Sequence, residues 1–208
     1  MQQHIVMLCS LDTKAPEAEY LRECIEEQGA ATILLDIGYG QPAKIPATIT
    51  ADDVAKAAGS DIESIYAMDD TGAASQLMMQ GAIIRIHGML CDGKCDGVIA
   101  FGGASNTTLA TSIMKSLPIG IPKLMISSAA AVPAYAAMYF GSRDITIMHS
   151  VVDMSGLNHL TRAFLRRGAG GICGMATCSS GGVSPSDDSK LIAVSSFRFA
   201  EACSQRVM

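Results

Sequence analysis

The sequence predicts an α/β fold, and three observations lead to that prediction. Short apolar runs recur along the chain, each followed by glycine or small polar residues and then by a helical pattern. These runs are continuous rather than alternating, as in strands that helices cover on both faces of a mostly parallel sheet. Of the 208 residues, 49% are apolar and 17% are charged, which excludes a disordered chain and leaves enough apolar surface for a core. Together they predict a Rossmann-like three-layer sandwich.

The first 36 residues predict a strand, a helix and a second strand. Residues 5–9 are a continuous apolar run. Pro16 suits the first turn of a helix whose apolar residues repeat at helical spacing until Gly29 ends it. A second apolar run over residues 32–35 ends at Asp36. A crossover between two such strands is expected to be right-handed if they are parallel.

The next segment predicts a loop and two helices. Residues 37–49 carry glycine and proline and predict a loop. Thr50 is expected to cap a short helix over residues 51–58. Residues 71–91 have apolar side chains nearly all round the helical projection. This pattern predicts a helix that is buried or lies at an interface.

The second half of the chain repeats the alternation of strands and helices. The predicted elements are a strand over 97–101, a helix over about 107–117, strands over 122–126 and 145–148, and a helix from Leu157 onward. We expect residues 127–137, which are mostly small, to form a loop.

One domain is predicted over residues 1–170. Residues 171–189 are rich in glycine and serine, which indicates a linker. Residues 190–208 resemble the start of a second α/β domain that is truncated. Because the charged fraction is low for a soluble domain, we expect a partner to cover some apolar surface, either a second copy in a homodimer or a second domain.

Charge and cysteine usage exclude several classes of function. The net charge is −5 and Arg166–Arg167 is the only adjacent basic pair, so binding of nucleic acid is not expected. The chain has seven cysteines and no leader-like start, which predicts a reduced, cytoplasmic protein. The pairs Cys91/Cys95 and Cys173/Cys178 lack a second pair at ligand spacing, so no metal site is predicted.

No membrane span is predicted, although some stretches lack charged residues. Residues 124–142 form such a stretch and contain Ser127, Ser128, Pro133 and Gly141. Segments of this composition are expected to be loops between buried strands.

Ligands bind beyond the carboxyl ends of the strands in parallel sheets, so the residues after each strand are the candidates. After residues 97–101, Gly102 and Gly103 allow a close approach of the backbone, and the N–H groups at the following helix start favour an anion. This pattern predicts either a phosphate cradle or a tight turn that needs glycine for packing. It is neither a Walker sequence nor a dinucleotide fingerprint.

Acidic and basic residues after the other strands also have two interpretations each. Lys14 is either a point charge for a phosphate or a solvated side chain. Asp12 either holds Mg²⁺ through water or caps a helix, and Asp36 either binds a ribose or forms a turn. Asp153 either contacts the ligand or caps the helix that follows. The full set of candidate ligand-binding residues is Asp12, Thr13, Lys14, Asp36, Gly102, Gly103, Ala104, Ser105, Asn106, Thr107, Thr108, Ser127, Ser128 and Asp153.

No catalytic residues are assigned from the sequence. The four histidines have no acid or nucleophile at a telling spacing, and the Ser127–Ser128 pair lacks a GxSxG motif. If the protein is an enzyme, the candidate bases are Asp12, His149 and Asp153.

Three blocks of sequence, in order, cover nearly the whole chain. They are the Ser10–Lys14 segment with Glu17, the Gly97–Thr107 segment, and the segments 120–127, 142–148, 150–153 and 156–158. These blocks resemble the Tm-1-like ATP-binding family, also called UPF0261. The chain departs from the family pattern at Ser10, where glycine is common, and at Thr71, where a basic residue is expected.

The resemblance implies an ATP-binding, Rossmann-like N-terminal domain of a two-domain protein, with Mg²⁺ as an optional companion of the nucleotide. It implies that Gly102, Gly103 and residues 105–108 hold phosphates, that Lys14 neutralises them, and that Asp36 holds the ribose or positions the base. The expected function is a ligand-binding or regulatory module of a cytoplasmic protein. Two alternatives stay open: a phosphotransferase or hydrolase whose site a second domain or partner completes, and a protein-interaction subunit that pairs through residues 71–91.

Overall fold

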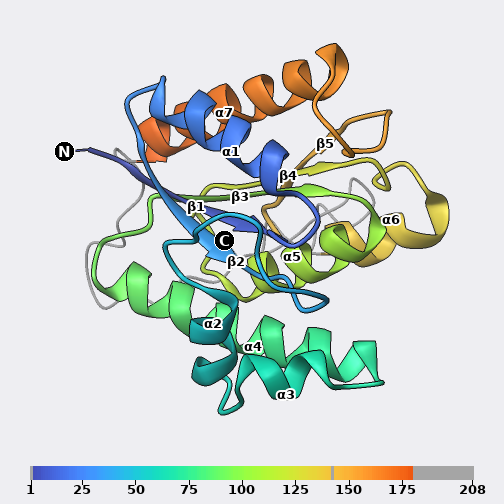
Figure 1. The fold of residues 1–208 in the computed structure, drawn as a ribbon. Helices are drawn as coiled ribbons and strands as arrows, with labels where there is room; N and C mark the ends of the chain where they lie inside the picture. The colour runs from blue at the N-terminus through green and yellow to red at the C-terminus, as the bar shows by residue number, and fades with distance from the viewer. Residues whose placement is uncertain (1, 142, 180–208) are drawn as a thin grey trace, which may run out of the picture.

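A five-stranded, all-parallel sheet forms the middle layer of the protein (Figure 1). The structure is a computed structural model that describes residues 2–141 and 143–179. The strand order is β2-β1-β3-β4-β5, which confirms the predicted Rossmann-like α/β fold. The strands are β1 (His4–Cys9), β2 (Ala31–Asp36), β3 (Gly97–Gly102), β4 (Lys123–Ser127) and β5 (Thr146–His149).

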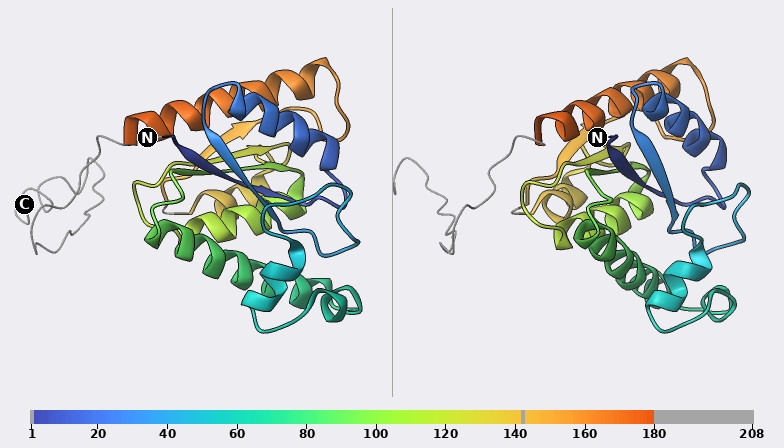
Figure 2. Two further views of the ribbon diagram at one scale, coloured as in Figure 1. Left: turned by 60° about the vertical axis from the view of Figure 1, so that its left-hand side comes forward. Right: turned by 90° about the vertical axis from the view of Figure 1, so that its left-hand side faces the viewer.

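Helices cover both faces of this sheet (Figures 1 and 2). One face carries α1 (Ala15–Glu26) and α7 (His159–Ser179), which pack against each other. The opposite face carries α5 (Ala104–Ser116), with α4 (Thr71–Cys91) and α6 (Pro133–Phe140) packed on it. Beside α4 lies α2 (Ala51–Ala57), which also contacts β2, and the short α3 (Ile62–Tyr66) packs on α2. The three predicted layers are therefore present.

The two faces of the strands feed two separate hydrophobic cores. Along β1, Val6 and Leu8 pack with α2, α4 and α5, whereas Ile5 and Met7 pack with α1 and α7. All six residues of β3 are buried. This is why the strands appear in the sequence as continuous apolar runs rather than as alternating ones.

The predicted linker is wrong for residues 171–179, which are the last two turns of α7. Two glycines of α7, Gly168 and Gly171, pack closely against the sheet, whereas a Cβ on Gly170 or Gly174 would meet no atom of the described residues within 4 Å. A Cβ on Gly168 would come within 2.4 Å of Ile126 Cδ1, and one on Gly171 within 3.0 Å of Leu124 Cδ1. Glycine thus lets the helix approach the sheet. The rest of the predicted linker and the start of a second domain, residues 180–208, lie outside the described residues.

Three further elements differ from the predictions. Helix α5 begins at Ala104, three residues before the predicted start at Thr107. Helix α3 was not predicted, although the Asp61 side chain caps it by accepting a hydrogen bond from Ser64 N–H. The stretch expected to be a loop contains α6, which begins at Pro133. In the part of the chain that the structure describes, no helix has the length and apolar character that crossing a membrane requires.

Candidate ligand-binding site

The carboxyl ends of β1 and β3 form the crevice where a ligand is expected. The chain leaves β1 toward α1 on one face of the sheet and leaves β3 toward α5 on the other face. Such a reversal opens a crevice at the carboxyl edge of a parallel sheet. The Ser10 hydroxyl donates a 2.9 Å hydrogen bond to Asn106 Oδ1 across this crevice. The structure therefore brings together the candidate residues that follow β1 and β3.

The two glycines after β3 have different roles. Gly102 has φ +148°, and a Cβ on it would lie only 2.7 Å from Asn106 Cβ, so packing of the turn requires glycine there. Gly103 is the N-cap of α5, and no side chain of residues 2–141 and 143–179 caps this helix. A Cβ on Gly103 would meet only Asp153 Oδ1 at 3.6 Å and Ser128 Oγ at 3.8 Å. The space beside Gly103 is therefore open, and Gly103 is the glycine that permits close approach of a ligand.

Three of the candidate hydroxyls are engaged inside the protein. The Thr107 hydroxyl donates to the Gly103 carbonyl oxygen at 2.7 Å and lies 2.7 Å from Ser127 Oγ. Ser127 Oγ also accepts a hydrogen bond from Ala129 N–H. The Thr108 hydroxyl donates to the Ala104 carbonyl oxygen at 2.9 Å. These hydroxyls therefore stabilise the turn and are not free to bind a ligand. The exposed residues in the first turn of α5 are Ala104 and Ser105.

The loops after β4 and β5 close the site beside Gly103. The Ser128 hydroxyl donates a 3.4 Å hydrogen bond to the exposed Asp153 carboxylate. His149 Nδ1 lies 3.2 Å from the Ser127 carbonyl oxygen. Val151, which lies between His149 and Asp153 in the sequence, is 72% exposed and has a backbone φ of +62°. β-branched residues rarely adopt this left-handed conformation. This strained residue projects from the same edge as Asp153, and the sequence contains no signal that identifies it.

On the other side of the crevice, two buried carboxylates lie close together. Asp36 is 1% exposed, and its Oδ1 accepts hydrogen bonds from Leu11 N–H at 3.1 Å and Gly38 N–H at 2.8 Å. Asp12 is 8% exposed, and its Oδ1 has no hydrogen-bond partner among the described residues. A Cβ on Gly38 would lie 3.0 Å from Oδ1 of both carboxylates, so the two oxygens converge on one point.

The environment of Asp36 disfavours its charged form. Burial raises the pKa of Asp36 above its ordinary value, the N–H groups of Gly38 and Leu11 pull the pKa down, and the neighbouring Asp12 pushes it up. Burial likewise raises the pKa of the Cys9 thiol at the end of β1, and the charges of Asp36 and Glu17 raise it further. Cys9 is therefore a structural thiol rather than a nucleophile.

Thr13 and Lys14 complete the loop after β1. Lys14 is half-buried and is the N-cap of α1, and Thr13 is exposed. Lys14 N–H donates to the Ser10 carbonyl oxygen at 2.9 Å. Lys14 belongs to none of the ion pairs formed by residues 2–141 and 143–179. Its ammonium group is thus not committed to a carboxylate at this edge of the sheet. Nowhere in those residues do three His, Cys, Asp or Glu side chains cluster as metal ligands.

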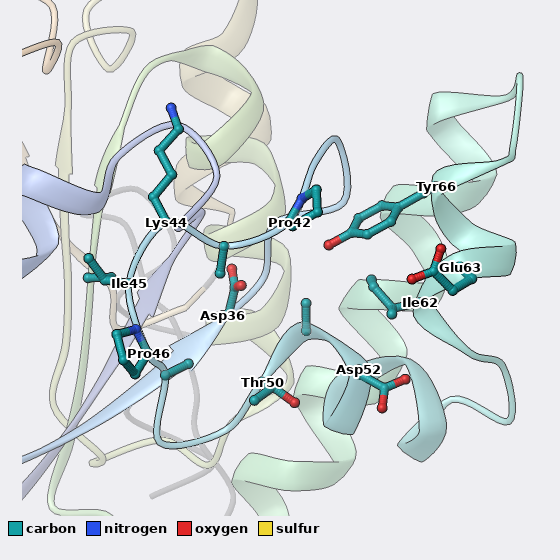
Figure 3. Close-up of a pocket in the computed structure, with 13 residues that line it drawn as sticks. Asp36, Pro42, Lys44, Ile45, Pro46, Thr50, Asp52, Ile62, Glu63 and Tyr66 are labelled. Carbon is teal, nitrogen blue, oxygen red and sulfur yellow. The ribbon is translucent and has the colours of Figure 1, made fainter.

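A cavity of about 520 Å³ lies next to the carboxylates, between the loop that follows β2 and helices α2 and α3 (Figure 3). Asp36 is part of its lining, together with Lys44, Thr50 and Tyr66. The Tyr66 hydroxyl donates to the Gln41 carbonyl oxygen at 3.1 Å and so ties the loop to α3. Sequence reasoning missed this cavity because it did not predict α3, whose only sequence signal was the Asp61 cap.

Comparison with known proteins places the chain among proteins of one family. The family model described as "Uncharacterised protein family (UPF0261) N-terminal domain" matches residues 3–180. A UPF0261 protein of Clostridium tetani is 35% identical over 175 residues, which are 84% of this chain and 43% of that protein. One of Mesorhizobium japonicum is 36% identical over 174 residues, which are 84% of this chain and 42% of that protein. The chain thus spans less than half the length of these relatives.

Two more distant similarities complete the comparison. The ToMV resistance protein Tm-1(GCR237) of Solanum lycopersicum is 39% identical over 79 residues, which are 38% of this chain and 10% of that protein. Among solved structures, a diflavin flavoprotein A3 from Nostoc sp. aligns with a TM-score of 0.41 and 9% sequence identity, covering 86% of this chain and 97% of that chain.

Proposed function

The chain belongs to the UPF0261 family, and from the geometry of its site we propose that it binds a phosphate-bearing small molecule, with ATP as the first candidate. It would act as a ligand-binding or regulatory module of a longer protein. The observation that carries the proposal is the uncapped N-terminus of α5 behind Gly103, at the crevice between β1 and β3.

The start of α5 offers donors that a phosphate would satisfy. The first N–H groups of a helix have no partner within the helix, and the helix dipole adds partial positive charge at this end. In α5 these are the N–H groups of Ala104, Ser105 and Asn106, and no side chain in the described part of the chain caps them. Gly103 leaves the approach open, and Lys14 follows the neighbouring strand with no ion pair among the described residues. This combination favours an anion that accepts several hydrogen bonds at once.

The Asp153 carboxylate predicts that a divalent cation accompanies the ligand. Its Oδ1 would lie 3.6 Å from a Cβ on Gly103, on the open side of the cradle. A second negative group there would repel a phosphate, and Mg²⁺ bound by the phosphates would offset that repulsion. Asp153 and Ser128 supply the oxygen atoms that suit such an ion. We therefore expect tighter binding of ATP with Mg²⁺ than without it.

Isothermal titration with ATP and tripolyphosphate, each with and without Mg²⁺, tests the proposal. The informative variant is Ser105→Glu, since a carboxylate in the first turn of α5 stabilises the helix by about 0.3–1 kcal/mol but repels an anion. We expect it to fold normally and to lose at least tenfold in affinity for both ligands. The matched control is Thr71→Glu, which adds the same charge to the first turn of α4, a helix that Asp70 already caps.

Unchanged binding by Ser105→Glu, or no binding by the wild type with Mg²⁺ present, would refute the proposal. Release of inorganic phosphate during the titration would instead favour the alternative of a phosphotransferase or hydrolase.

The proposal extends to a cytoplasmic protein with a partner on its apolar surface, either a second copy or a second domain. Val132, Tyr135 and Met138, at the start and along the outer side of α6, are each at least 40% exposed. Exposed apolar residues on a single helix support such a covered surface. Light scattering of the full chain would determine whether the partner is a second copy.

A further inference from the structure

The loop between β5 and α7 is tied to α1 by a buried carboxylate. Glu17, in the first turn of α1, is 2% exposed, and its Oε1 accepts a 2.5 Å hydrogen bond from Gly156 N–H. The Gly156 carbonyl oxygen accepts a 2.9 Å hydrogen bond from the Thr161 hydroxyl of α7. A hydrogen bond to a carboxylate is roughly twice as strong as one between neutral groups. Gly156 is therefore a fixed point of this loop, held from both helices.

The start of the same loop is a strained turn. Val152 N–H donates a 2.6 Å hydrogen bond to the Ser150 carbonyl oxygen, which forms a γ-turn with Val151 at its centre. The φ of +62° at Val151 belongs to the rare, strained form of this turn. Ser150 is fully buried, and its hydroxyl donates to the Val152 carbonyl oxygen at 2.8 Å. Because a strained turn persists only when the surrounding structure holds it, the loop depends on its anchor at Gly156.

Asp153 lies between the strained turn and the anchor. Its carboxylate is exposed, and Asn158 rather than Asp153 caps α7, by accepting two N–H groups of the first turn. The hydrogen bond from the Ser128 hydroxyl to Asp153 is 3.4 Å long, beyond the usual range for an O–H donor, and so holds the carboxylate only weakly. The backbone of the loop therefore decides whether Asp153 faces Gly103.

We propose that Glu17 is a positioning residue for the ligand site: by fixing Gly156, it holds the Asp153 carboxylate beside the start of α5. The inference rests on the proposed function, in which Asp153 faces a Mg²⁺ ion that accompanies the phosphates. Glu17 contacts neither the ligand nor the ion and acts through the loop. Because Glu17 follows Lys14 by one helical turn, a single side chain couples the segment after β1 to the loop after β5.

Hydrogen exchange of residues 150–158, measured without ligand, tests the anchor. Glu17→Ala removes the acceptor of the Gly156 N–H and should speed exchange of this segment roughly tenfold or more. Glu17→Gln keeps an Oε1 that accepts the same N–H and should leave exchange within about threefold of the wild type. The matched control is Glu23→Ala, which removes an exposed carboxylate of the same helix that belongs to no ion pair in the described part of the chain.

Titration with tripolyphosphate, with and without Mg²⁺, tests the effect on the site. The informative quantity is the magnesium gain, the ratio of the affinity with Mg²⁺ to the affinity without it. A loop released from its anchor carries Asp153 away from Gly103, so Glu17→Ala should lower the magnesium gain at least fivefold and weaken Mg²⁺-free binding less than twofold. Glu17→Gln and Glu23→Ala should keep the wild-type gain. In combination with Asp153→Asn, Glu17→Ala should lower the gain no further, because both substitutions act through one carboxylate.

Glu17→Asp guards against a folding defect in Glu17→Ala. It keeps the negative charge in the first turn of α1 and withdraws the carboxylate from Gly156 by one methylene group. Glu17→Asp should therefore change the exchange rate and the magnesium gain in the same directions as Glu17→Ala.

Three outcomes would overturn the inference and leave the phosphate proposal standing. Unchanged exchange in both Glu17→Ala and Glu17→Asp would mean that Glu17 does not hold the loop. An equal loss of affinity with and without Mg²⁺ would mean that Glu17 stabilises the fold alone, and a wild type without a magnesium gain would leave Asp153 without a cation. A wild type that binds no tripolyphosphate would refute the proposed function, and the role of Glu17 at the site with it, even where exchange shows the anchor.

Discussion

The two halves of the carboxyl edge of the sheet differ in the groups they present. The loops after β3, β4 and β5, which we call the donor half, present glycine, backbone N–H groups and serine hydroxyls around Gly103. The loops after β1 and β2, the carboxylate half, present Asp12 and Asp36 beside the cavity. The donor half favours an anion and the carboxylate half favours a donor-bearing neutral group. The two halves of this edge, about two strand spacings apart, therefore favour opposite kinds of ligand group.

The two halves also differ in how they are held. Side-chain hydroxyls hold the donor half, since Thr107 and Ser127 bond to each other and to the turn. Backbone N–H groups hold the carboxylate half through Asp36, and the outer wall of its cavity depends on α2. Substitutions at glycines that pack closely should therefore affect the two halves separately.

The largest expected effect is on the carboxylate half, at the contact between α4 and α2. A Cβ on Gly81 of α4 would lie 1.9 Å from the Val54 carbonyl oxygen, a backbone atom that cannot move cheaply. Gly81→Ala should therefore lower the free energy of unfolding by about 3 kcal/mol, the upper end for overpacking a core. Urea denaturation measures this loss of stability.

Gly88 in the same helix provides the control for Gly81→Ala. A Cβ on Gly88 would meet no atom of the described residues within 4 Å, so Gly88→Ala should raise the free energy of unfolding by up to about 1 kcal/mol through helix propensity. Equal effects of the two substitutions would contradict the packing argument.

A smaller effect is expected in the donor half, where two adjacent glycines should behave differently. Gly102→Ala would place a Cβ 2.7 Å from Asn106 Cβ at φ +148°, and should lower the free energy of unfolding by about 2 kcal/mol. Gly103→Ala meets only ordinary contacts and should cost less than about 1 kcal/mol, as expected at an N-cap. Its methyl group would fill the open space at the cradle, and so should weaken tripolyphosphate binding at least tenfold.

Thermal unfolding and titration of both variants would measure this contrast. Retained tripolyphosphate binding by Gly103→Ala would mean that the ligand does not approach there, and both glycines would then serve packing alone.

The sequence predicted the layers of the fold well because its signals were local and unopposed. Continuous apolar runs marked all five strands, and the Thr50 cap of α2 is present as a reciprocal capping box with Asp53. The glycines of α7 misled the prediction because two of them have a long-range role. Gly168 and Gly171 pack against Ile126 and Leu124 of β4, and no local pattern distinguishes such contacts from a flexible linker. In helix α4, Met78 and Ile86 are buried but Ile84 is 54% exposed. The helix is therefore less buried than its apolar sequence predicted.

The candidate site was predicted as a set of strand ends, but the roles within it were not predictable. The sequence shows that Thr107 follows Gly103, but only the structure shows that the Thr107 hydroxyl is hydrogen-bonded to the Gly103 carbonyl oxygen and to Ser127 Oγ. The convergence of Asp12 and Asp36 at Gly38 depends on the register of β1 with β2. Because these relations join distant segments, they require the strand order and the side-chain geometry together.

The smallest expected effect is a pH dependence that distinguishes the buried carboxylate half from the protein surface. Burial raises the pKa of Asp36, and Asp12 adds to this, while the N–H groups of Gly38 and Leu11 oppose it. Above the ordinary Asp pKa of about 4, the folded state then holds this proton more tightly than the unfolded state does. The free energy of unfolding therefore decreases as the pH rises from about 4 through the raised pKa, and is level beyond it. Asp36→Asn should remove that decrease.

Asp61 should show the opposite sign, since the N–H and hydroxyl of Ser64 lower its pKa in the folded state. Its contribution to stability is present above the ordinary Asp pKa and is lost as the pH falls through the lowered pKa. Urea denaturation from pH 3 to pH 7 should thus give a stability difference, variant minus wild type, that rises with pH for Asp36→Asn and falls with pH for Asp61→Asn. Slopes of the same sign would mean that the N–H groups of Gly38 and Leu11 outweigh burial and hold the pKa of Asp36 below its ordinary value.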